Sequence, residues 1–581
     1  MTVIAGFLRR APVRDDNPPP ATVAARMCSA AAPGSGIVAF ANGGLAVACP
    51  AANPGPIWSE DGAVGVILDD DPGARHAAQL AREWSRSGVA ALRELTGAFR
   101  VVVIDRRSRE VVLCNDRHGL GRVFVHDDGN GLYFATSVRA LLAVLPASRR
   151  LDPQGLAEYL AAGCVLQDRT LYPGIRSLPP GSAWTLSPDG TVRPSRHFTP
   201  AQWEALPSLP TDEYNLRLFE DFPPALARCL GDGADTALSL TGGLDSRAVL
   251  AWIPAGGLPC YTFGGPLREC ADVTIARRLA TARGCPHTTL RVGQEFFAAF
   301  PQLAADAIIA SDGELDVSGA VEVHVNRAAR RIAGRRLTGN YGSEILRGHV
   351  ALRPRPLDPS LLRPEYRRLA AEGLATLARE SVAHPLTFIA FKQVPWHHRA
   401  RFAVERSELG PCTPFLDPAV VALGYQAPAG RQHSPDPLLR LIAARSRELA
   451  AIPSDRGLRH PPRPLITALS RLWRESTARA EYLWDYGLPR WVAPLERRLR
   501  HLHPERFFLG RHKFTHFRLW YRDPLAPAVR DLLDGWDAPG FEPGATARVA
   551  AEHFSGRANR TLELHQLLSL RLIETQLLHP A

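Results

Sequence analysis

The chain has 581 residues, 45% of them hydrophobic and 22% charged, which is typical of globular proteins and enough for two or more domains. Its net charge of +11 comes from arginines scattered along the chain rather than from a basic run with interleaved aromatic residues, so we expect no nucleic-acid partner. No apolar run reaches the roughly 18 residues of a membrane span, and the first residues lack the charge order of a secretory signal, so the sequence predicts a cytoplasmic protein without a membrane partner.

The nine cysteines form an odd and dispersed set without a C-x-x-C pair. Such a set is typical of reduced thiols inside a cell. We therefore expect all nine to be free.

The first 200 residues alternate short strand-like runs with turns. Residues 3–7 predict a buried strand, and the β-branched blocks within 95–105 and from Val111 onward predict further strands. Residues 132–137 predict one more strand, which leads into a helix from Val138. A proline-rich linker at 207–212 follows this part of the chain.

Strand-like and helical runs alternate after the linker. Strands are predicted at 236–240, 258–264 and 285–292, and helices at 213–230, 272–283 and 317–333. This alternation predicts a doubly wound parallel sheet, which binds its ligands at the carboxyl ends of the strands. From Pro461 onward the pattern is helical, without an internal repeat.

The run from Ser239 to Arg247 is a Gly-rich turn between a predicted strand and a predicted helix. Gly242 and Gly243 allow backbone N–H groups to converge on an anion, and the helix N-terminus adds its partial positive charge. The carboxylate of Asp245 would repel phosphates unless a cation lay between them, so we expect it to bind Mg²⁺. A strand-to-helix turn that merely needs glycine is the alternative.

A Walker A loop is excluded, because it needs a lysine and the only lysines of the chain are Lys392 and Lys513. The turn instead resembles the S-G-G-x-D-S pyrophosphate loop of the N-type ATP pyrophosphatases, with Thr241 in place of the first serine. Residues 337–348 resemble the l-S-G-E-G-S-D-E-x-F-G-G block of asparagine synthetase B, and residues 413–417 resemble its v-P-F-L-D block. The blocks at 97–99, 115–124, 134–141 and 170–181 resemble its glutaminase half.

The resemblance to the asparagine synthetase B family, whose relatives include β-lactam synthetase and lasso-peptide cyclase, implies an α/β fold in three parts. Residues 1–200 would form a glutaminase-like Ntn-type β-sandwich domain, and residues 210–460 a PP-loop synthetase domain with the doubly wound sheet. Residues 461–581 would form a helical extension of the synthetase domain.

The resemblance also implies a set of site residues. ATP would be bound by Ser239, Thr241, Gly242, Gly243, Asp245, Ser246, Thr262, Gly264, Thr338 and Gly339. Glu344 matches the second metal ligand of the family, so it would hold Mg²⁺ together with Asp245. Tyr341 stands where β-lactam synthetase has a tyrosine that helps to deprotonate an amine, although a strand end with a cap is the alternative.

Arg456 replaces the lysine with which the family stabilises charge on the reacting phosphate. An arginine has a planar fork in place of an ammonium group, so the exchange is not neutral, and a structural arginine is an equal alternative. Thr2 stands where the family has its N-terminal cysteine nucleophile, and an N-terminal threonine can also attack with its own amino group as base. The glutamine-holding R-G-P-D and N-G-E-I-Y-N segments are missing, so we expect this half to be inactive.

These observations favour an ATP- and Mg²⁺-dependent, asparagine-synthetase-like ligase. It would adenylate a small-molecule carboxylate, aspartate in the simplest version, release AMP and pyrophosphate, and form an amide with ammonia or an amine. One alternative is an intramolecular amide ligase like β-lactam synthetase or lasso-peptide cyclase, and another is a non-catalytic nucleotide-binding protein. A homodimer is a further expectation, without a residue pattern to specify it.

Overall fold

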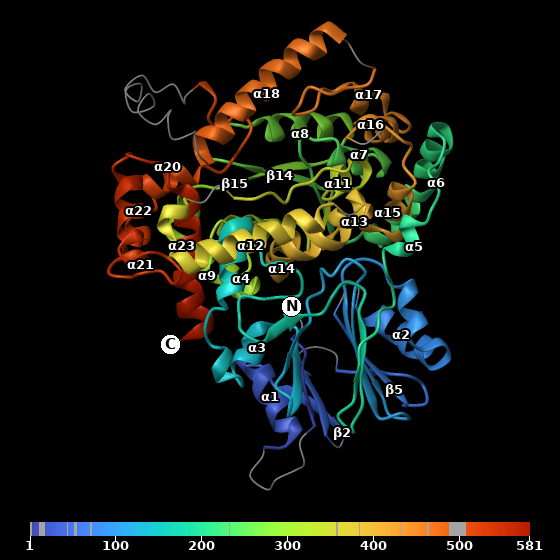
Figure 1. The fold of residues 1–581 in the computed structure, drawn as a ribbon. Helices are drawn as coiled ribbons and strands as arrows, with labels where there is room; N and C mark the ends of the chain where they lie inside the picture. Colours follow the sequence, from blue (N-terminus) through green and yellow to red (C-terminus); the bar gives the residue numbers. More distant parts are fainter. Residues whose placement is uncertain are drawn as a thin grey trace.

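The computed structural model describes residues 3–10, 18–42, 44–51, 55–69, 73–231, 233–355, 358–382, 384–430, 433–461, 464–486 and 507–580. Thr2 lies outside these residues, so its predicted role has no structural counterpart here. Figure 1 shows a β-sandwich at the bottom, a parallel sheet with its helices at the top, and the C-terminal helices along one side.

Two six-stranded antiparallel sheets form the sandwich, as predicted. The first has the order β10-β8-β9-β1-β3-β2, with β1 Ala5–Arg9, β2 Ile37–Asn42, β3 Leu45–Pro50, β8 Phe124–Asp127, β9 Gly131–Ala135 and β10 Ile175–Ser177. The second has the order β12-β11-β7-β6-β5-β4, with β4 Ile57–Trp58, β5 Val64–Asp69, β6 Arg100–Asp105, β7 Glu110–Asn115, β11 Ala183–Leu186 and β12 Val192–Arg193.

Strand β6 illustrates how the sequence specifies a two-sheet sandwich, because it has apolar side chains on both faces. Its side chains alternate between the two faces, as the period of a strand requires. Val102 and Ile104 enter the core between the sheets, whereas Val101 and Val103 pack against helix α2 (Gly73–Ser87) on the outer face. The other helices of this half are α1 (Pro20–Ala31), α3 (Val138–Leu142) and α4 (Pro153–Ala162).

The parallel sheet has the order β15-β14-β13-β16-β17, which confirms the doubly wound prediction. Its strands are β13 Thr236–Ser239, β14 Cys260–Gly264, β15 His287–Arg291, β16 Arg335–Thr338 and β17 Gly410–Cys412. The chain builds outward from β13 to β15 and then returns to the other side of β13 with β16. The strand order therefore reverses between β13 and β16, and a crevice at this switch point is where such sheets bind ligands.

The helices around the sheet include the three predicted at 213–230, 272–283 and 317–333, each of which begins within two residues of the predicted position. They are α6 Thr211–Leu230, α7 Asp245–Trp252, α8 Ala271–Ala282, α9 Gln294–Ala310, α10 Gly319–Ala329, α11 Gly342–Arg347, α12 Pro364–Glu380, α13 Pro385–Phe388, α14 Arg399–Glu408, α15 Pro418–Tyr425, α16 Asp436–Ala443 and α17 Arg447–Ala451. Between α13 and α14 lies a π-helical stretch, Ile389–His398.

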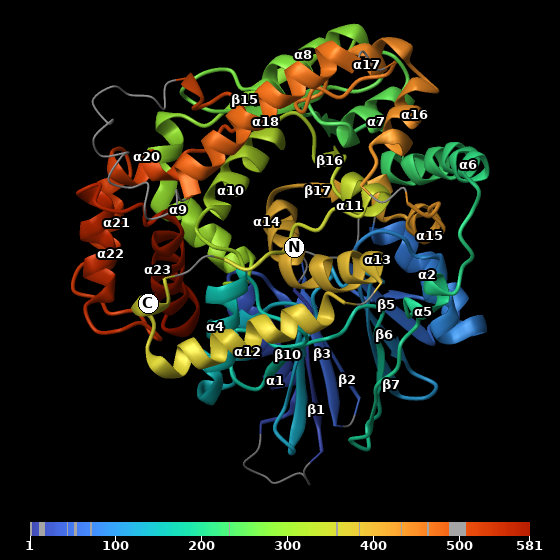
Figure 2. The ribbon, with the colours of Figure 1, turned by 45° about the horizontal axis from the view of Figure 1, so that its top comes forward.

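The described residues beyond 461 are mainly helical, as predicted. The helices are α18 Pro464–Tyr486, α20 Phe517–Arg522, α21 Ala526–Leu533, α22 Ala545–Phe554 and α23 Thr561–Ile573, with a π-helical turn at Glu574–Leu578. Figure 2 shows α23 beside α9. One cluster of buried side chains runs from Phe7 in β1 through Phe296 in α9 to Leu567 in α23, so both halves share a hydrophobic core. None of the described helices combines the length and apolar character needed to cross a bilayer.

The expectation that all nine cysteines are free is wrong for one pair. Cys229 at the end of α6 forms a disulfide with Cys412 in β17, with 5.7 Å between their Cα atoms. These residues are 183 positions apart, so no local spacing could indicate the pair. The other seven cysteines are free and buried.

Candidate active site

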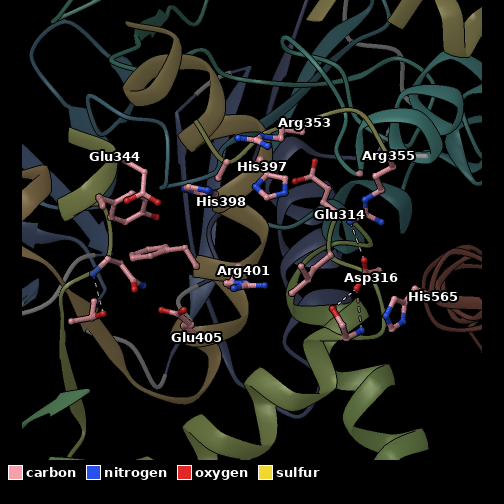
Figure 3. A pocket seen from close by; sticks show the side chains of 18 of the residues that line it. Glu314, Asp316, Glu344, Arg353, Arg355, His397, His398, Arg401, Glu405 and His565 are labelled. Carbon is pink, nitrogen blue, oxygen red and sulfur yellow. Dashed lines mark hydrogen bonds and ion pairs between the residues drawn. The ribbon is translucent and has the colours of Figure 1, made fainter. Parts of the chain in front are cut away.

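A cavity of about 800 Å³ opens at the carboxyl ends of β13 and β16. Eight of the predicted site residues line it, namely Ser239, Thr241, Asp245, Ser246, Thr338, Gly339, Tyr341 and Glu344. In Figure 3, Glu344 lies at one side of this cavity, and Asp316, Arg355 and His565 lie at the other. The cavity is thus continuous between the Gly-rich loop and a second, more distant compartment.

Hydrogen bonds between Thr241 and Ser246 connect the two ends of the Gly-rich loop. The Ser246 Oγ atom accepts a hydrogen bond from the Thr241 N–H at 3.0 Å and lies 3.0 Å from the Thr241 hydroxyl. Arg247, which is fully buried, donates to the carbonyl groups of Gly242 and Leu449 at 3.2 Å and also to that of Ile452. A buried guanidinium therefore joins the loop to the segment after α17.

The two loop glycines differ from the expectation that their N–H groups face the cavity. The Gly242 N–H donates to Asp272 Oδ1 at 2.8 Å, and the Gly243 N–H donates to the Thr241 hydroxyl at 3.3 Å. Burial and the neighbouring Asp455 raise the pKa of Asp272 to about 6. Gly242 and Gly243 shape the loop, whereas the hydroxyls of Ser239, Thr241 and Ser246 line the cavity.

Asp245 and Glu344 bring two carboxylates to the reversal point of the sheet. Each lies in the first turn of a helix, α7 after β13 and α11 after β16. Burial raises the pKa of Asp245 to about 6, and burial together with the Asp245 charge raises that of Glu344 to about 7. The described residues contain no group of three or more His, Cys, Asp or Glu side chains that could hold a metal ion. A cation here would therefore have two protein carboxylates and would need further ligands from a substrate or water.

Two glycines allow the ends of β13 and β16 to approach each other. A Cβ atom on Gly339 would lie 2.2 Å from the Ser246 backbone nitrogen, and one on Gly342 would lie 2.9 Å from the Asp245 side chain. Any larger residue at either position would push the two carboxylate-bearing turns apart. Thr338 precedes this contact, and its hydroxyl accepts a hydrogen bond from the Asn340 N–H at 3.2 Å.

Tyr341 has a left-handed backbone, with φ of 73°, directly before α11. Its ring is buried with its centroid 5.4 Å from that of His398. Burial, with Glu405 and Glu344 nearby, raises the pKa of Tyr341 well above its ordinary value, and burial lowers the pKa of His398 to about 3. Both rings are therefore neutral at physiological pH, and the tyrosine carries its proton.

Besides Gly242 and Gly243, three more predicted site residues lie apart from the cavity lining. The Arg456 side chain is 57% exposed, and its Nε atom lies 3.6 Å from the adjacent Asp455 carboxylate. The Thr262 hydroxyl donates to the Leu240 carbonyl at 2.7 Å, which links β14 to β13. Gly264 ends β14, where a Cβ atom would meet the Thr289 side chain at 3.0 Å.

Several cavity residues have no counterpart in the prediction. Arg336 of β16 is buried and donates to Ser239 Oγ at 3.2 Å, so it places a cation beside the Gly-rich loop. A charged residue inside a buried parallel strand is the sequence signal that could have identified it. The far compartment is lined by charged and aromatic side chains, which are Glu314, Asp316, Arg353, Arg355, His397, Tyr482, Tyr486 and His565. Arg401 and Glu405 line the cavity nearer the Gly-rich loop, where Glu405 forms an ion pair with Arg336 at 3.4 Å.

Two family models match this chain. The glutamine amidotransferase domain matches residues 77–198, and asparagine synthase matches residues 219–432, which contain the Gly-rich loop and both carboxylates. Together these matches support an asparagine synthetase B-like family.

Curated family members match parts of the chain. Asparagine synthetase [glutamine-hydrolyzing] 3 of Bacillus subtilis is 30% identical over 30% of this chain and 27% of its own length. Asparagine synthetase [glutamine-hydrolyzing] 1 of the same organism is 21% identical over 48% of this chain and 45% of its own length. The chain thus aligns with less than half of either synthetase. The solved structure of NMN synthetase from Francisella tularensis covers 34% of this chain and 95% of its own, with 16% identity and a TM-score of 0.18.

Proposed function

We propose that this protein is an ATP-dependent, amide-forming carbon–nitrogen ligase. It adenylates a carboxylate, releases pyrophosphate, and transfers the activated acyl group to a nitrogen nucleophile with release of AMP. The observation that carries the proposal is the placement of Asp245 and Glu344 at the ends of adjacent parallel strands, on one cavity with the Gly-rich loop. The family matches support the same reaction class.

The residues at the loop fit a magnesium triphosphate. Two buried carboxylates whose pKa values are raised to about 6 and about 7 repel each other, and a divalent cation between them removes that repulsion. The Ser239, Thr241 and Ser246 hydroxyls supply hydrogen bonds to phosphate oxygens, and Arg336 supplies positive charge. The metal, when bound, would neutralise charge on the phosphates during transfer.

Arg336, which was not predicted, is better placed than the predicted Arg456 to act on the phosphates, because it lines the cavity and contacts Ser239. Tyr341 has its ring next to that of His398 and carries its proton, so it enters the reaction as a hydrogen-bond donor. A tyrosine in this state can orient the nitrogen nucleophile or pass a proton onward, but it needs a partner to remove one.

Release of pyrophosphate from ATP and Mg²⁺ tests the proposal, with aspartate as the carboxylate and either ammonium or glutamine as the nitrogen source. Release with ammonium alone establishes the ligase and shows that the N-terminal half supplies no ammonia. Release with both means that Thr2 acts as the nucleophile of glutamine hydrolysis. Absence of release from the wild type in both, with release by Bacillus subtilis asparagine synthetase 3 as positive control, refutes aspartate as the substrate.

The size of the cavity favours a second candidate, an intramolecular amide ligase like β-lactam synthetase or lasso-peptide cyclase. A volume of about 800 Å³ is near the upper end for small-molecule sites, so it leaves room for a substrate larger than aspartate beside a nucleotide. Its far compartment also carries carboxylates, arginines and tyrosines that suit a larger polar substrate with several functional groups. Pyrophosphate release that requires an amine-bearing carboxylate substrate, with no need for ammonium, distinguishes this candidate from asparagine synthesis.

A further inference from the structure

The segment of residues 311–318, which joins α9 to α10, forms part of the far compartment, because Glu314 and Asp316 line it (Figure 3). Two consecutive residues in this segment have left-handed backbone, Asp312 with φ of 53° and Gly313 with φ of 83°. For Asp312 this conformation is unfavourable in isolation. Contacts from elsewhere in the fold must therefore hold the segment in shape.

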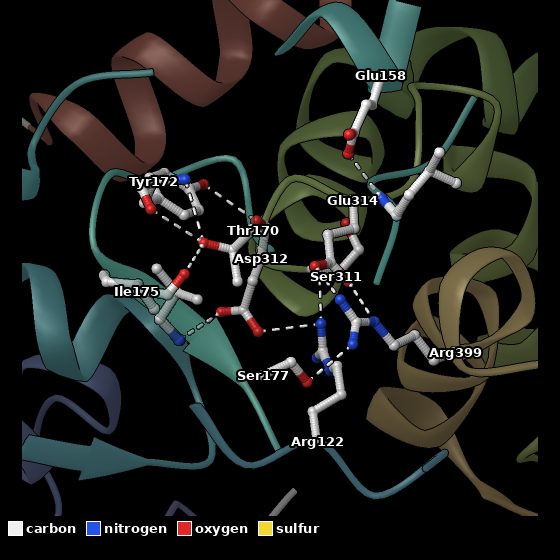
Figure 4. Close-up of polar contacts among 12 residues, drawn as sticks. Arg122, Glu158, Thr170, Tyr172, Ile175, Ser177, Ser311, Asp312, Glu314 and Arg399 are labelled. Atoms are coloured by element: carbon white, nitrogen blue, oxygen red, sulfur yellow. Dashed lines mark hydrogen bonds and ion pairs between the residues drawn. The ribbon is translucent and has the colours of Figure 1, made fainter. Parts of the chain in front are cut away.

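Arg122 of the N-terminal half supplies the first set of contacts (Figure 4). Its guanidinium donates to the Ala310 and Ser311 carbonyls at 2.7 and 2.8 Å, and it forms an ion pair with Asp312 at 3.0 Å. Each side chain of this pair is only 2% exposed. One buried arginine thus satisfies the last carbonyls of α9 and fixes the residue with the unfavourable backbone.

Two further oxygen atoms of Asp312, Oδ1 and the carbonyl oxygen, also accept hydrogen bonds from the N-terminal half. Its Oδ1 atom accepts hydrogen bonds from the Ser137 hydroxyl and the Val138 N–H, both at 3.0 Å. Its carbonyl oxygen accepts a third from the Tyr172 hydroxyl at 3.0 Å. The conformation of Asp312 is therefore set by four residues from the sandwich side of the molecule.

A second buried arginine extends this network to another wall of the cavity. Arg399 binds Glu314 with two hydrogen bonds, at 2.9 and 2.6 Å, and donates to the Ser177 hydroxyl of β10 at 2.8 Å. It directly follows His397 and His398, which also line the cavity. Ser177 and Arg122 therefore approach the far compartment from the same half of the chain (Figure 4).

We propose that Arg122 is a positioning residue for the ligase reaction, which holds the 311–318 segment so that Glu314 and Asp316 face the second substrate. The inference rests on the proposed function for the identity of that substrate site. The amidotransferase-like half would then have a role that requires no glutamine hydrolysis. It would hold the 311–318 segment, whose carboxylates contact the second substrate.

The full chain with Arg122→Met tests this by amide hydrogen exchange. Arg117→Met is the matched control, because Arg117 is also buried and donates to two carbonyls, those of Leu95 and Arg93, within the N-terminal half alone. We expect residues 311–318 to exchange roughly tenfold faster or more in Arg122→Met and to be unchanged in Arg117→Met. Residues 241–248 should exchange at the wild-type rate in both.

Kinetics supply the second readout, with aspartate as the probe in the pyrophosphate assay. We expect Arg122→Met to raise the KM for aspartate roughly tenfold, with the KM for ATP and kcat within about twofold of wild type. Arg117→Met should change neither KM. If wild-type protein gives no release with aspartate, the simplest form of the proposed function fails, and hydrogen exchange alone decides the inference.

Asp312→Asn provides an independent test should Arg122→Met not fold, because it can keep the acceptor for Ser137 and Val138 and removes the ion pair with Arg122. We expect a smaller increase of exchange, about threefold, over the same residues. Equal exchange of residues 311–318 in the wild type and in both variants would overturn the proposal. So would an increase of the same size in Arg117→Met, because it would reflect a general loss of stability.

Discussion

The Ser343 hydroxyl donates a hydrogen bond to Asp245 Oδ1 at 2.9 Å and thereby joins the helix after β16 to the carboxylate after β13. The bond orients a carboxylate that is proposed to bind Mg²⁺. Ser343→Ala leaves this carboxylate buried with fewer donors, so we expect the Mg²⁺ concentration for half-maximal pyrophosphate release to rise about 10- to 100-fold. Ser360→Ala removes a similar bond, to Asp358 at 2.8 Å, and should leave the Mg²⁺ dependence unchanged. Equal Mg²⁺ dependence in all three proteins would contradict the assignment.

In the presence of EDTA, the free energy of unfolding should decrease as the pH rises through the range in which Asp245 and Glu344 lose their protons. Asp245 and Glu344 release their protons near pH 6 and 7 in the folded chain, compared with 3.8 and 4.5 when unperturbed. Within this window the folded state holds more protons than the unfolded state, so the free energy of unfolding decreases with increasing pH. Glu344→Gln should weaken this decrease, as seen by thermal unfolding between pH 4 and 8.

Added Mg²⁺ should reverse the loss of stability at the upper end of that range in the wild type but not in Glu344→Gln. Glu220→Gln, at an exposed position of α6, serves as the control and should behave like wild type. A pH dependence that is identical in wild type and Glu344→Gln would show that the pair does not titrate as described.

Tyr341→Phe should affect amide formation but not adenylation of the carboxylate. The variant keeps the ring against His398 and removes only the hydroxyl group. We expect the exchange of labelled pyrophosphate into ATP to remain within about twofold of wild type, while amide formation falls about 100-fold, a typical effect of losing a proton-transfer group. An equal loss in both reactions would place the hydroxyl in adenylation instead.

Arg247→Met should destabilise the whole synthetase part, because this side chain donates to the Gly242 carbonyl of the Gly-rich loop and to the Ile452 carbonyl after α17. Hydrogen bonds from a charged donor contribute about 1.5–3 kcal/mol each, and removing Arg247 takes this donor away from buried carbonyls. We expect a fall of several degrees in Tm by calorimetry. Arg277→Met breaks only an exposed ion pair with Glu269 and should change Tm by less than about 2 °C.

The sequence predicted the framework of the site well, because local patterns specify it. The apolar run at 236–240, the glycines after it and the following helix correspond to β13, the loop and α7. Alternation of strands and helices also predicted the doubly wound sheet, whose order places Asp245 next to Glu344. These features depend on residues that are close together in sequence or on general rules of chain topology.

Contacts between distant segments could not be predicted in the same way. Arg336 reaches Ser239 across 97 positions, and Arg122 reaches the Ser311 carbonyl across 189. Both depend on how whole elements pack, and an arginine in isolation gives no sign of which carbonyl or carboxylate it will meet. The same holds for Gly242, whose N–H binds Asp272 only because α8 packs against the loop.

The core shared by the two halves imposes an order on folding during synthesis. The Leu160 carbonyl of α4 accepts a hydrogen bond from Gln566 of α23 at 2.8 Å, and the side chains around it belong to the buried cluster that begins at β1. While the ribosome is still translating the middle of the chain, α4 lacks this partner and one side of the cluster faces water. The N-terminal sandwich can therefore form its own sheets early, but its outer helical face becomes fully packed only after α23 has left the exit tunnel.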